Sequence, residues 1–274
     1  MKRFPVLRLL SNRRLFTSSS AEVGFRRSEF GRERLVGTVQ PYDRHLFLHY
    51  GSPATWPSDV EAEEGLPRSL SLAIKARKGE MKKKTRLTIH GGPDDAASTS
   101  SGDILIFPDM VKYRNLSSQH VDDFVEEVLV KETKWQSSSM QALNGSYIFI
   151  CSHGTRDQRC GFCGPVLVSK FREDIAALGL ADKVFVSPCA HIGGHKYAGN
   201  VIIFDSSFNG ESTGHWYGYV SPDDVPVLLE HHVTGGKIVE NLWRGQVGLS
   251  REEQKRAQEL RLQSASEIAS TNNR

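Results

Sequence analysis

The chain has 274 residues, 38% of them hydrophobic and 24% charged, with a formal net charge of +3. This composition is that of an ordinary globular protein with room for one large or two small domains. No apolar stretch approaches the roughly 18 residues that a membrane span requires. Residues 1–27 hold seven Lys or Arg against one Glu and contribute +6, which leaves −3 for the remainder. A mildly acidic body does not indicate nucleic-acid binding.

The N-terminus has the composition of a targeting sequence. Arginines are spaced among leucines and phenylalanines in residues 1–20, four serines are present, and no acid occurs before Glu22. This pattern is typical of a mitochondrial or chloroplast transit peptide, and a disordered basic arm is the alternative. The arginine content and short length favour the mitochondrion over the chloroplast, with the cytosol as a further alternative. We therefore expect residues 1–40 to be a transit peptide or disordered.

Two long stretches of the chain repeat one pattern. The segment HLFLHYGSPATWPS at 45–58 aligns with YIFICSHGTRDQRC at 147–160 at an offset of 102. Each is followed by a helical stretch and then by a strand (69–78 and 85–89 in one copy, 166–178 and 183–186 in the other). Shared order at a nearly constant offset favours an internal duplication over coincidence.

The repeat continues from Gly102 and Gly199, each of which precedes a four-residue apolar run ending in Phe. From Tyr113 and Tyr217 onward the offset is a constant 104, and a serine-capped amphipathic helix follows in both copies. Each half therefore predicts the order β-α-β-β-β-α of a thioredoxin-like α/β domain. We expect two tandem thioredoxin-like domains and a charged tail, at 41–135, 136–248 and 249–274.

The C-terminal tail is rich in helix formers, and only Leu260, Leu262 and Ile268 offer apolar contacts. A frayed or solvated helix is the default interpretation. Just before the tail, Trp243 and Arg244 are expected to anchor the last segment on the sheet.

The two halves differ where chemistry would reside. His49 and Ser58 stand at the positions of Cys151 and Cys160, and the first half contains no cysteine. The first domain is therefore expected to lack cofactor ligands and to serve as structure or docking surface.

Cysteines and histidines gather on two predicted strand-end loops of the second half. Cys151 and Cys160 follow the run YIFI, and His191 and His195 follow KVFV. Two thiolates and two imidazoles on adjacent loops predict a metal site, of zinc or iron–sulfur type. Four cysteines, three of them within 13 positions, do not resemble a secreted disulfide framework.

Three kinds of site remain open on spacing alone. Zinc suits a Cys₂His₂ set and the C-x₂-C spacing of Cys160 and Cys163, but eight residues separate Cys151 from Cys160. Cys160 and Cys163 at a predicted helix start also suit a thiol–disulfide oxidoreductase. A [2Fe–2S] cluster needs one ligand pair per iron from separate loops, which Cys151 with Cys160 and His191 with His195 would supply. Cys163 and Cys189 are then left over, and Cys189, two residues before His191, could substitute as a ligand or pack nearby.

The stretches CSHGTRDQRCGFCGPVL, VFVSPCAHIGGHKYAGNVIIF, GHWYGYVSPDDVPVLL and NLWRGQVG, with LIFPDMVKYRNL in the first half, resemble the plant members of the sucrase/ferredoxin-like family. The resemblance covers roughly residues 42–248 and extends to thioredoxin-like ferredoxins and the yeast actin-patch-distal and altered-inheritance-of-mitochondria proteins. It implies a C-terminal thioredoxin-like domain that is ferredoxin-like in cofactor, with a [2Fe–2S] cluster. The implied ligands are Cys151, Cys160, His191 and His195.

The expected function is electron transfer rather than catalysis on a substrate of the protein's own. An iron-bound imidazole can keep a second, titratable nitrogen whose proton affinity rises on reduction, so the one-electron step is expected to be proton-coupled. No paired-carboxylate motif supports glycoside hydrolysis, whatever the family's name. A redox partner protein is expected but unidentified, with no nucleic acid and no membrane span.

Overall fold

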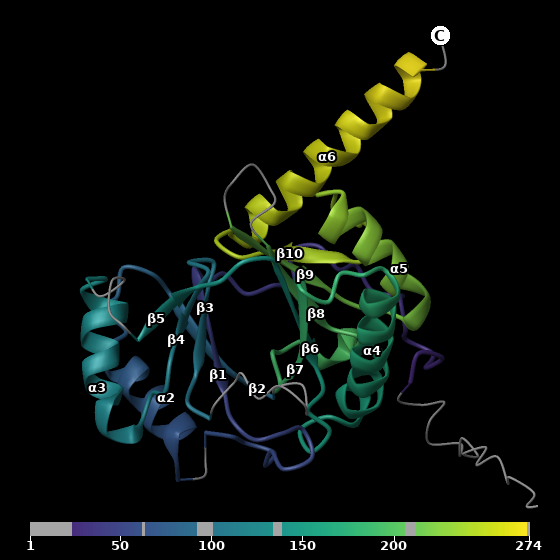
Figure 1. The fold of residues 1–274 in the computed structure, drawn as a ribbon. Coiled ribbons are helices and arrows are strands. Elements are labelled where there is room, and N and C mark those ends of the chain that lie inside the picture. Colours follow the sequence, from purple (N-terminus) through teal and green to yellow (C-terminus); the bar gives the residue numbers. More distant parts are fainter. Residues whose placement is uncertain (1–23, 62–63, 92–100, 134–138, 206–211, 273–274) are drawn as a thin grey trace, which may run out of the picture.

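The computed structural model describes residues 24–61, 64–91, 101–133, 139–205 and 212–272 (Figure 1). The first part contains, in chain order, β1 (Arg44–His49), α2 (Leu66–Ala76), β2 (Thr85–His90), β3 (Ile104–Phe107), β4 (Val111–Tyr113), the 3-10 turn η1 (Ser118–His120), α3 (Val121–Phe124), the π-helical η2 (Val125–Val130) and β5 (Met140–Ala142).

The second part repeats this order and adds a 3-10 turn and a C-terminal helix. Its elements are β6 (Ser146–Cys151), α4 (Gln158–Ala177), β7 (Val184–Cys189), η3 (His195–Tyr197), β8 (Val201–Asp205), β9 (Thr213–Tyr217), η4 (Pro222–Asp224), α5 (Val225–Val227), the π-helical η5 (Leu228–Thr234), β10 (Trp243–Gln246) and α6 (Arg251–Asn272).

Each half has a parallel strand pair at its centre. β1 and β2 run parallel, β3 pairs antiparallel with β1, and β4 with β3; β6, β7, β8 and β9 repeat this arrangement. The strand orders are therefore β2-β1-β3-β4 and β7-β6-β8-β9. The predicted α/β fold with tandem thioredoxin-like units is confirmed by this topology. β5 lies beyond the predicted boundary at residue 135 and pairs with β4, while the boundary itself stays a prediction.

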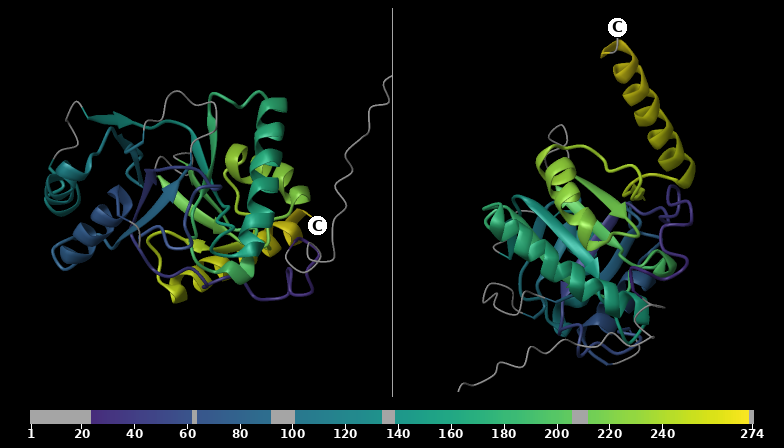
Figure 2. Two further views of the ribbon diagram at one scale, coloured as in Figure 1. Left: turned by 90° about the horizontal axis from the view of Figure 1, so that it is seen from below. Right: turned by 90° about the vertical axis from the view of Figure 1, so that its right-hand side faces the viewer.

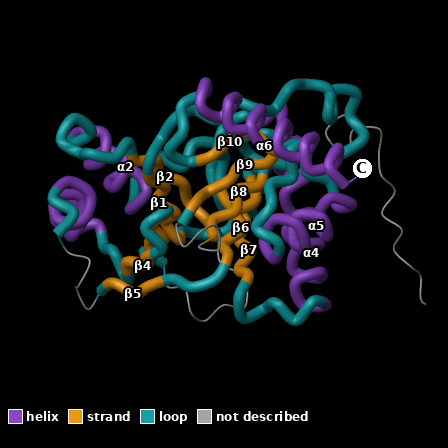
Figure 3. Tube along the Cα trace, turned by 90° about the horizontal axis from the view of Figure 1, so that it is seen from above, coloured by secondary structure: helices purple, strands orange, loops and turns teal. Residues whose placement is uncertain are grey.

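Residue alternation along the strands builds four layers. In β6, Ile148 and Ile150 pack with helices α4 and α5, whereas Phe149 and Cys151 point to the opposite face. In β1, Leu46 and Leu48 likewise pack with α2 and α3. The two halves of the single ten-stranded sheet thus lie between an α2/α3 layer and an α4/α5 layer, as Figures 2 and 3 show from below and above.

An aromatic core fills the space between the two halves of the sheet. Phe47 of β1 stacks on Phe149 of β6 with ring centroids 3.6 Å apart, and Phe107 stacks on Phe204 at 4.4 Å. All four rings are at most 1% exposed. Full burial of each such side chain stabilises the fold by roughly 1.5–3 kcal/mol, so the two halves form one cooperative body.

The segment before β1 differs from the one predicted from the sequence. Residues 1–23 lie outside the described part, but residues 24–40 pack on the body: Arg27 is 3% exposed, and Val36 and Val39 are buried. The stretch expected to be presequence or disordered therefore contributes a packed segment from residue 24.

Helix α6 leaves the body and projects outward (Figures 1 and 2). Its first half is fixed to the body: the buried Gln254 side chain donates to the Leu249 carbonyl at 3.0 Å and the Val39 carbonyl at 3.3 Å, and Arg261 forms an ion pair with Glu240. Leu260 and Leu262 are about half exposed, so most of the helix is solvated. Over the described ranges, every helix is too short or too polar to cross a bilayer.

Candidate metal centre

The parallel strands β6 and β7 bring the two predicted ligand loops together. Cys151 ends β6 and lies in register with Cys189, which ends β7. Because the carboxyl ends of parallel strands meet at one edge, the loops that follow them lie side by side. Cys160 returns to this edge in the first turn of α4, which starts at Gln158.

Three of the four predicted ligands converge at this edge. One ligand atom each from Cys151, Cys160 and His191 lies within 4.8 Å of the other two. Both cysteines are at most 1% exposed. His191 Nδ1 is buried and has no hydrogen-bond partner. Two soft sulfurs and an unpartnered imidazole nitrogen are the donor set that zinc or an iron–sulfur cluster takes, so the residues fit a metal centre.

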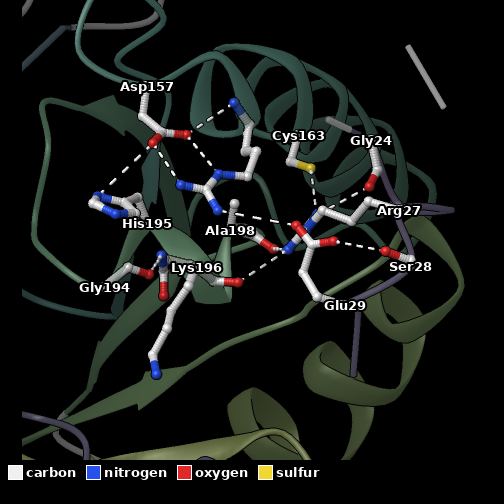
Figure 4. A network of polar contacts seen from close by, with 12 residues as sticks. Gly24, Arg27, Ser28, Glu29, Asp157, Cys163, Gly194, His195, Lys196 and Ala198 are labelled. Atoms are coloured by element: carbon white, nitrogen blue, oxygen red, sulfur yellow. Dashed lines mark hydrogen bonds and ion pairs between the residues drawn. The ribbon is translucent and has the colours of Figure 1, made fainter. Parts of the chain in front are cut away.

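The fourth predicted residue, His195, lies beside this group. Its ring centroid is 5.6 Å from that of His191, its side chain is 53% exposed, and its Nδ1 is 3.8 Å from a carboxylate oxygen of Asp157 (Figure 4). Asp157 is also the N-cap of α4 and accepts a hydrogen bond from the Arg159 backbone N–H at 2.9 Å. Ligation by these four residues remains a prediction.

Glycines allow the cysteine loop to close. A Cβ on Gly161 would lie 2.4 Å from the Gly154 Cα, and one on Gly164 would lie 2.4 Å from the Cys151 carbonyl oxygen. Side chains at either position would therefore push α4 away from β6. The run CGFCG thus lets the helix approach closely enough for Cys160 to reach Cys151.

The loop from His191 to His195, called the histidine loop below, is held by side chains that bind its backbone carbonyls. Gly193 and Gly194 have φ values of +86° and +70°, in the left-handed region that favours glycine. The Asn200 side chain donates to the Gly194 carbonyl at 2.9 Å, and the Arg244 guanidinium donates to the Asn200 side-chain oxygen at 2.6 Å. Arg86 donates to the Ile192 carbonyl.

His153 links the two loops and the first half. Its Nδ1 accepts a hydrogen bond from the His191 backbone N–H at 3.2 Å, and its Nε2 donates to the Pro57 carbonyl at 2.7 Å. These two bonds define the tautomer with a proton on Nε2. Burial, the largest cause, lowers the pKa of His153 below its ordinary value, which keeps Nδ1 available as an acceptor.

The thiols of the site differ in acidity. The hydrogen bond from the Cys160 thiol lowers the pKa of Cys151 well below its ordinary value, and His191 adds to this effect. The same hydrogen bond raises the pKa of Cys160. Cys151 is therefore the thiolate of the pair, the state in which sulfur binds metal.

The remaining cysteines are not members of this group, although Cys189 pairs in register with Cys151. Cys163 faces the N-terminal segment, where its sulfur is 3.7 Å from an Arg27 guanidinium nitrogen, and burial raises its pKa to about 11 (Figure 4). Burial also raises the pKa of Cys189. All four cysteines of the chain are buried and free of disulfides. Raised thiol pKa values do not favour the Cys160/Cys163 oxidoreductase alternative.

Two arginines, the buried Arg244 and the partly buried Arg86, were not singled out as site residues from the sequence. Arg244 was expected to anchor the last segment with Trp243. Trp243 does so through a bond from its indole N–H to His215 at 3.2 Å, but Arg244 instead faces the histidine loop. Arg86 carried no signal, because it lies in a strand of the other half. Desolvation lowers the pKa of Arg244 to about 10 and that of Arg86 below its ordinary value.

The equivalent edge of the first half has different chemistry. His49 takes the place of Cys151, and His90 that of Cys189, with the two rings 5.3 Å apart. Burial lowers the pKa of His90 to about 3, so it is neutral. Within the described ranges, the Cys151, Cys160 and His191 group is the one set of metal-capable residues found.

The fold and the site define a thioredoxin-like protein with a cysteine–histidine centre at a strand-end edge. The sequence profile of the sucrase/ferredoxin-like family matches residues 35–245. The chain belongs to the sucrase/ferredoxin-like family.

Known relatives and structures include fungal and bacterial proteins. Altered inheritance of mitochondria protein 32 of Meyerozyma guilliermondii is 29% identical over 244 residues, covering 78% of this chain and 84% of the relative. The protein of that name from Debaryomyces hansenii is 42% identical over 107 residues, covering 39% and 38%. Actin patches distal protein 1 of Saccharomyces cerevisiae is 30% identical over 155 residues, covering 50% and 48%. The chain thus spans less than half of the last two relatives.

Among solved structures, the thioredoxin-like [2Fe-2S] ferredoxin from Aquifex aeolicus is 24% identical, with a TM-score of 0.30. The match covers 36% of this chain and 96% of that chain.

Proposed function

We propose that this protein transfers electrons and binds a [2Fe–2S] cluster through Cys151, Cys160, His191 and His195. The observation that carries the proposal is the convergence within 4.8 Å of two buried sulfurs and the His191 imidazole, whose Nδ1 is buried without a hydrogen-bond partner. His195 lies on the same loop, with its ring beside that of His191. When bound, the cluster would supply one-electron redox chemistry without substrate turnover.

The residues around the ligands suit coupling to protons. An imidazole that binds metal through one nitrogen keeps the other for a proton. The His195 side chain is half exposed to solvent, and its Nδ1 lies 3.8 Å from an oxygen of the Asp157 carboxylate. His195 is therefore the group proposed to take up a proton when the site gains an electron.

The direct test is the visible spectrum of anaerobically purified protein with iron and acid-labile sulfide counts. The proposal expects a coloured protein with two irons and two sulfides per chain. Cys151→Ser should lose the colour, whereas Cys163→Ser should keep it, because Cys163 faces Arg27. A colourless protein with one zinc would support the structural zinc alternative. A metal-free protein whose titratable dithiol is lost in Cys163→Ser would support the oxidoreductase alternative.

The relatives' names and the basic N-terminus support a mitochondrial location, which is part of this proposal. Import of the full chain into isolated mitochondria, with protection from added protease, would test it. Deletion of residues 1–20 should abolish import. Retention of import by the truncated chain would contradict the location assigned from the presequence.

A further inference from the structure

A cationic cavity lies against the histidine loop. It has a volume of about 390 Å³, and its lining includes Arg86, Lys196, Arg244 and Arg251 together with the backbone of Gly193 and Gly194. Among the described residues that line it, none is acidic. Four positive charges around one small cavity focus a field that attracts negative charge.

The two inner arginines are held by neutral partners. Arg244 is 2% exposed, donates to Asn200 and to the Thr38 hydroxyl at 3.0 Å, and lies over the Tyr197 ring at 4.5 Å. Its bonds therefore position the guanidinium without neutralising it. A buried cation without a carboxylate partner is costly unless an anion approaches it.

Arg86 enters from the first half and resembles Arg244 in its surroundings. It donates to the Ile192 carbonyl, and its guanidinium lies over the Trp216 ring at 5.2 Å. Ile192 directly follows the predicted ligand His191, so this contact places Arg86 beside the metal centre as well as in the cavity. The positive charges of Arg86 and Arg244 therefore act on both the cavity and the metal centre.

The outer cations lie at the mouth of the cavity. Lys196 is about half exposed and pairs with Glu33, which does not line the cavity. Arg251 is exposed and starts helix α6. Gly193 and Gly194 let the two arginines lie against the loop: an added Cβ would be 3.6 Å from an Arg86 guanidinium nitrogen at Gly193 and 2.5 Å from an Arg244 guanidinium nitrogen at Gly194.

We propose that this cavity binds a small anion with two or more negative charges, of the phosphate or carboxylate class, against the backbone of the histidine loop. The cavity is small, and the guanidinium groups of Arg86 and Arg244 line it. Such groups suit a small molecule that accepts paired hydrogen bonds. Binding itself does not depend on the proposed function. The consequence for redox does rest on it: an added negative charge beside the loop disfavours electron uptake and lowers the reduction potential.

The test is calorimetric titration of the full-length protein with inorganic phosphate and, separately, with succinate, at constant ionic strength in potassium chloride. Saturable binding of one anion identifies its class, and binding of both identifies the shared chemistry. Arg251→Gln should weaken binding about three- to tenfold, as expected for one charge contact at a part-solvated mouth. Arg256→Gln removes a cation from the same exposed helix outside the cavity and should leave binding unchanged.

Arg86→Lys provides a second variant, because it keeps the charge but loses the planar fork. It should weaken binding as well. Failure of both anions to saturate the wild-type protein would overturn the site, as would equal losses in Arg251→Gln and Arg256→Gln. A coloured protein that binds neither anion would remove the anion site alone. A colourless protein that still binds would remove the cluster alone.

Discussion

His90 lies opposite Cys189 where β2 meets β7, and among the described residues this is the one paired position joining the two halves of the sheet. Backbone bonds flank it, from the Gly91 N–H to the Pro188 carbonyl at 3.0 Å and from the Ala190 N–H to the Ile89 carbonyl at 2.9 Å. The junction therefore lies two residues before the predicted ligand His191.

Acid should weaken this junction. Burial lowers the pKa of His90 from about 6.5 to about 3 in the folded chain. The folded state therefore binds fewer protons than the unfolded state, and the stability it contributes is complete above pH 6.5 and is lost as the pH falls toward 3. Between pH 7 and pH 5 the loss should be about 2 kcal/mol of unfolding free energy.

Denaturant unfolding at several pH values would measure this loss. His90→Leu should reduce the acid slope, whereas His120→Leu, at an exposed position, should not. An unchanged slope in His90→Leu would contradict the prediction.

His153→Ala should loosen the cofactor site without touching a ligand. The change removes the acceptor for the His191 N–H and the donor to Pro57. Loss of such an orienting bond typically costs at least about tenfold in metal affinity. The measurement is the rate of colour loss in excess chelator.

His153→Gln, which keeps an acceptor and a donor, should restore part of the lifetime. Arg156→Ala, on the same loop but exposed, should match the wild type. Equal rates in wild type and His153→Ala would show that the bond does not support the site.

Gly161→Ala should separate α4 from the loop after β6. Its Cβ would lie 2.4 Å from the Gly154 Cα, and backbone on both sides leaves no flexible side chain to move. Overpacking of this kind costs about 1–3 kcal/mol, and Cys160 should move away from Cys151. Unfolding free energy and cluster content should therefore both fall. Gly79→Ala, where an added Cβ meets nothing within 4 Å, is the matched control.

The reduction potential should depend on pH. The reduced site is more negative, so an imidazole with a free nitrogen has a higher pKa in the reduced state than in the oxidised state. Between those two pKa values one proton accompanies each electron, and the potential should fall by about 59 mV per pH unit. Potentiometric titration across the imidazole range would measure it. His195→Cys should flatten the curve, and a flat curve in the wild type would exclude proton coupling.

Strand identity and the duplication could be predicted from the sequence. The runs YIFI, ILIF and VIIF combine β-branched and aromatic residues, and the constant offset after Tyr113 and Tyr217 corresponds to equivalent strand ends in β4 and β9. The short, half-exposed β5 was missed because it has no such run.

The convergence of Cys151, Cys160 and His191 was predictable because parallel strands end at one edge. Contacts between distant segments were not. Arg27 reaches Cys163 across 136 positions, and neither residue carries a pattern that predicts the other. The aromatic core between the two halves could not be predicted either. The alternation of residues along a strand shows that one face is apolar, but it does not show which element covers that face.

Exposure differs sharply within the predicted ligand set, since both cysteines are buried while His195 is half exposed. In a bound cluster, the iron held by the cysteines would be covered by the two halves of the sheet and by α4. The iron held by the histidines would be nearer the surface, so the shortest path for an electron would pass through the imidazoles. Electrons would then enter and leave the cluster at the same surface. The electron donor and the electron acceptor would have to bind there in turn rather than on opposite sides of the molecule.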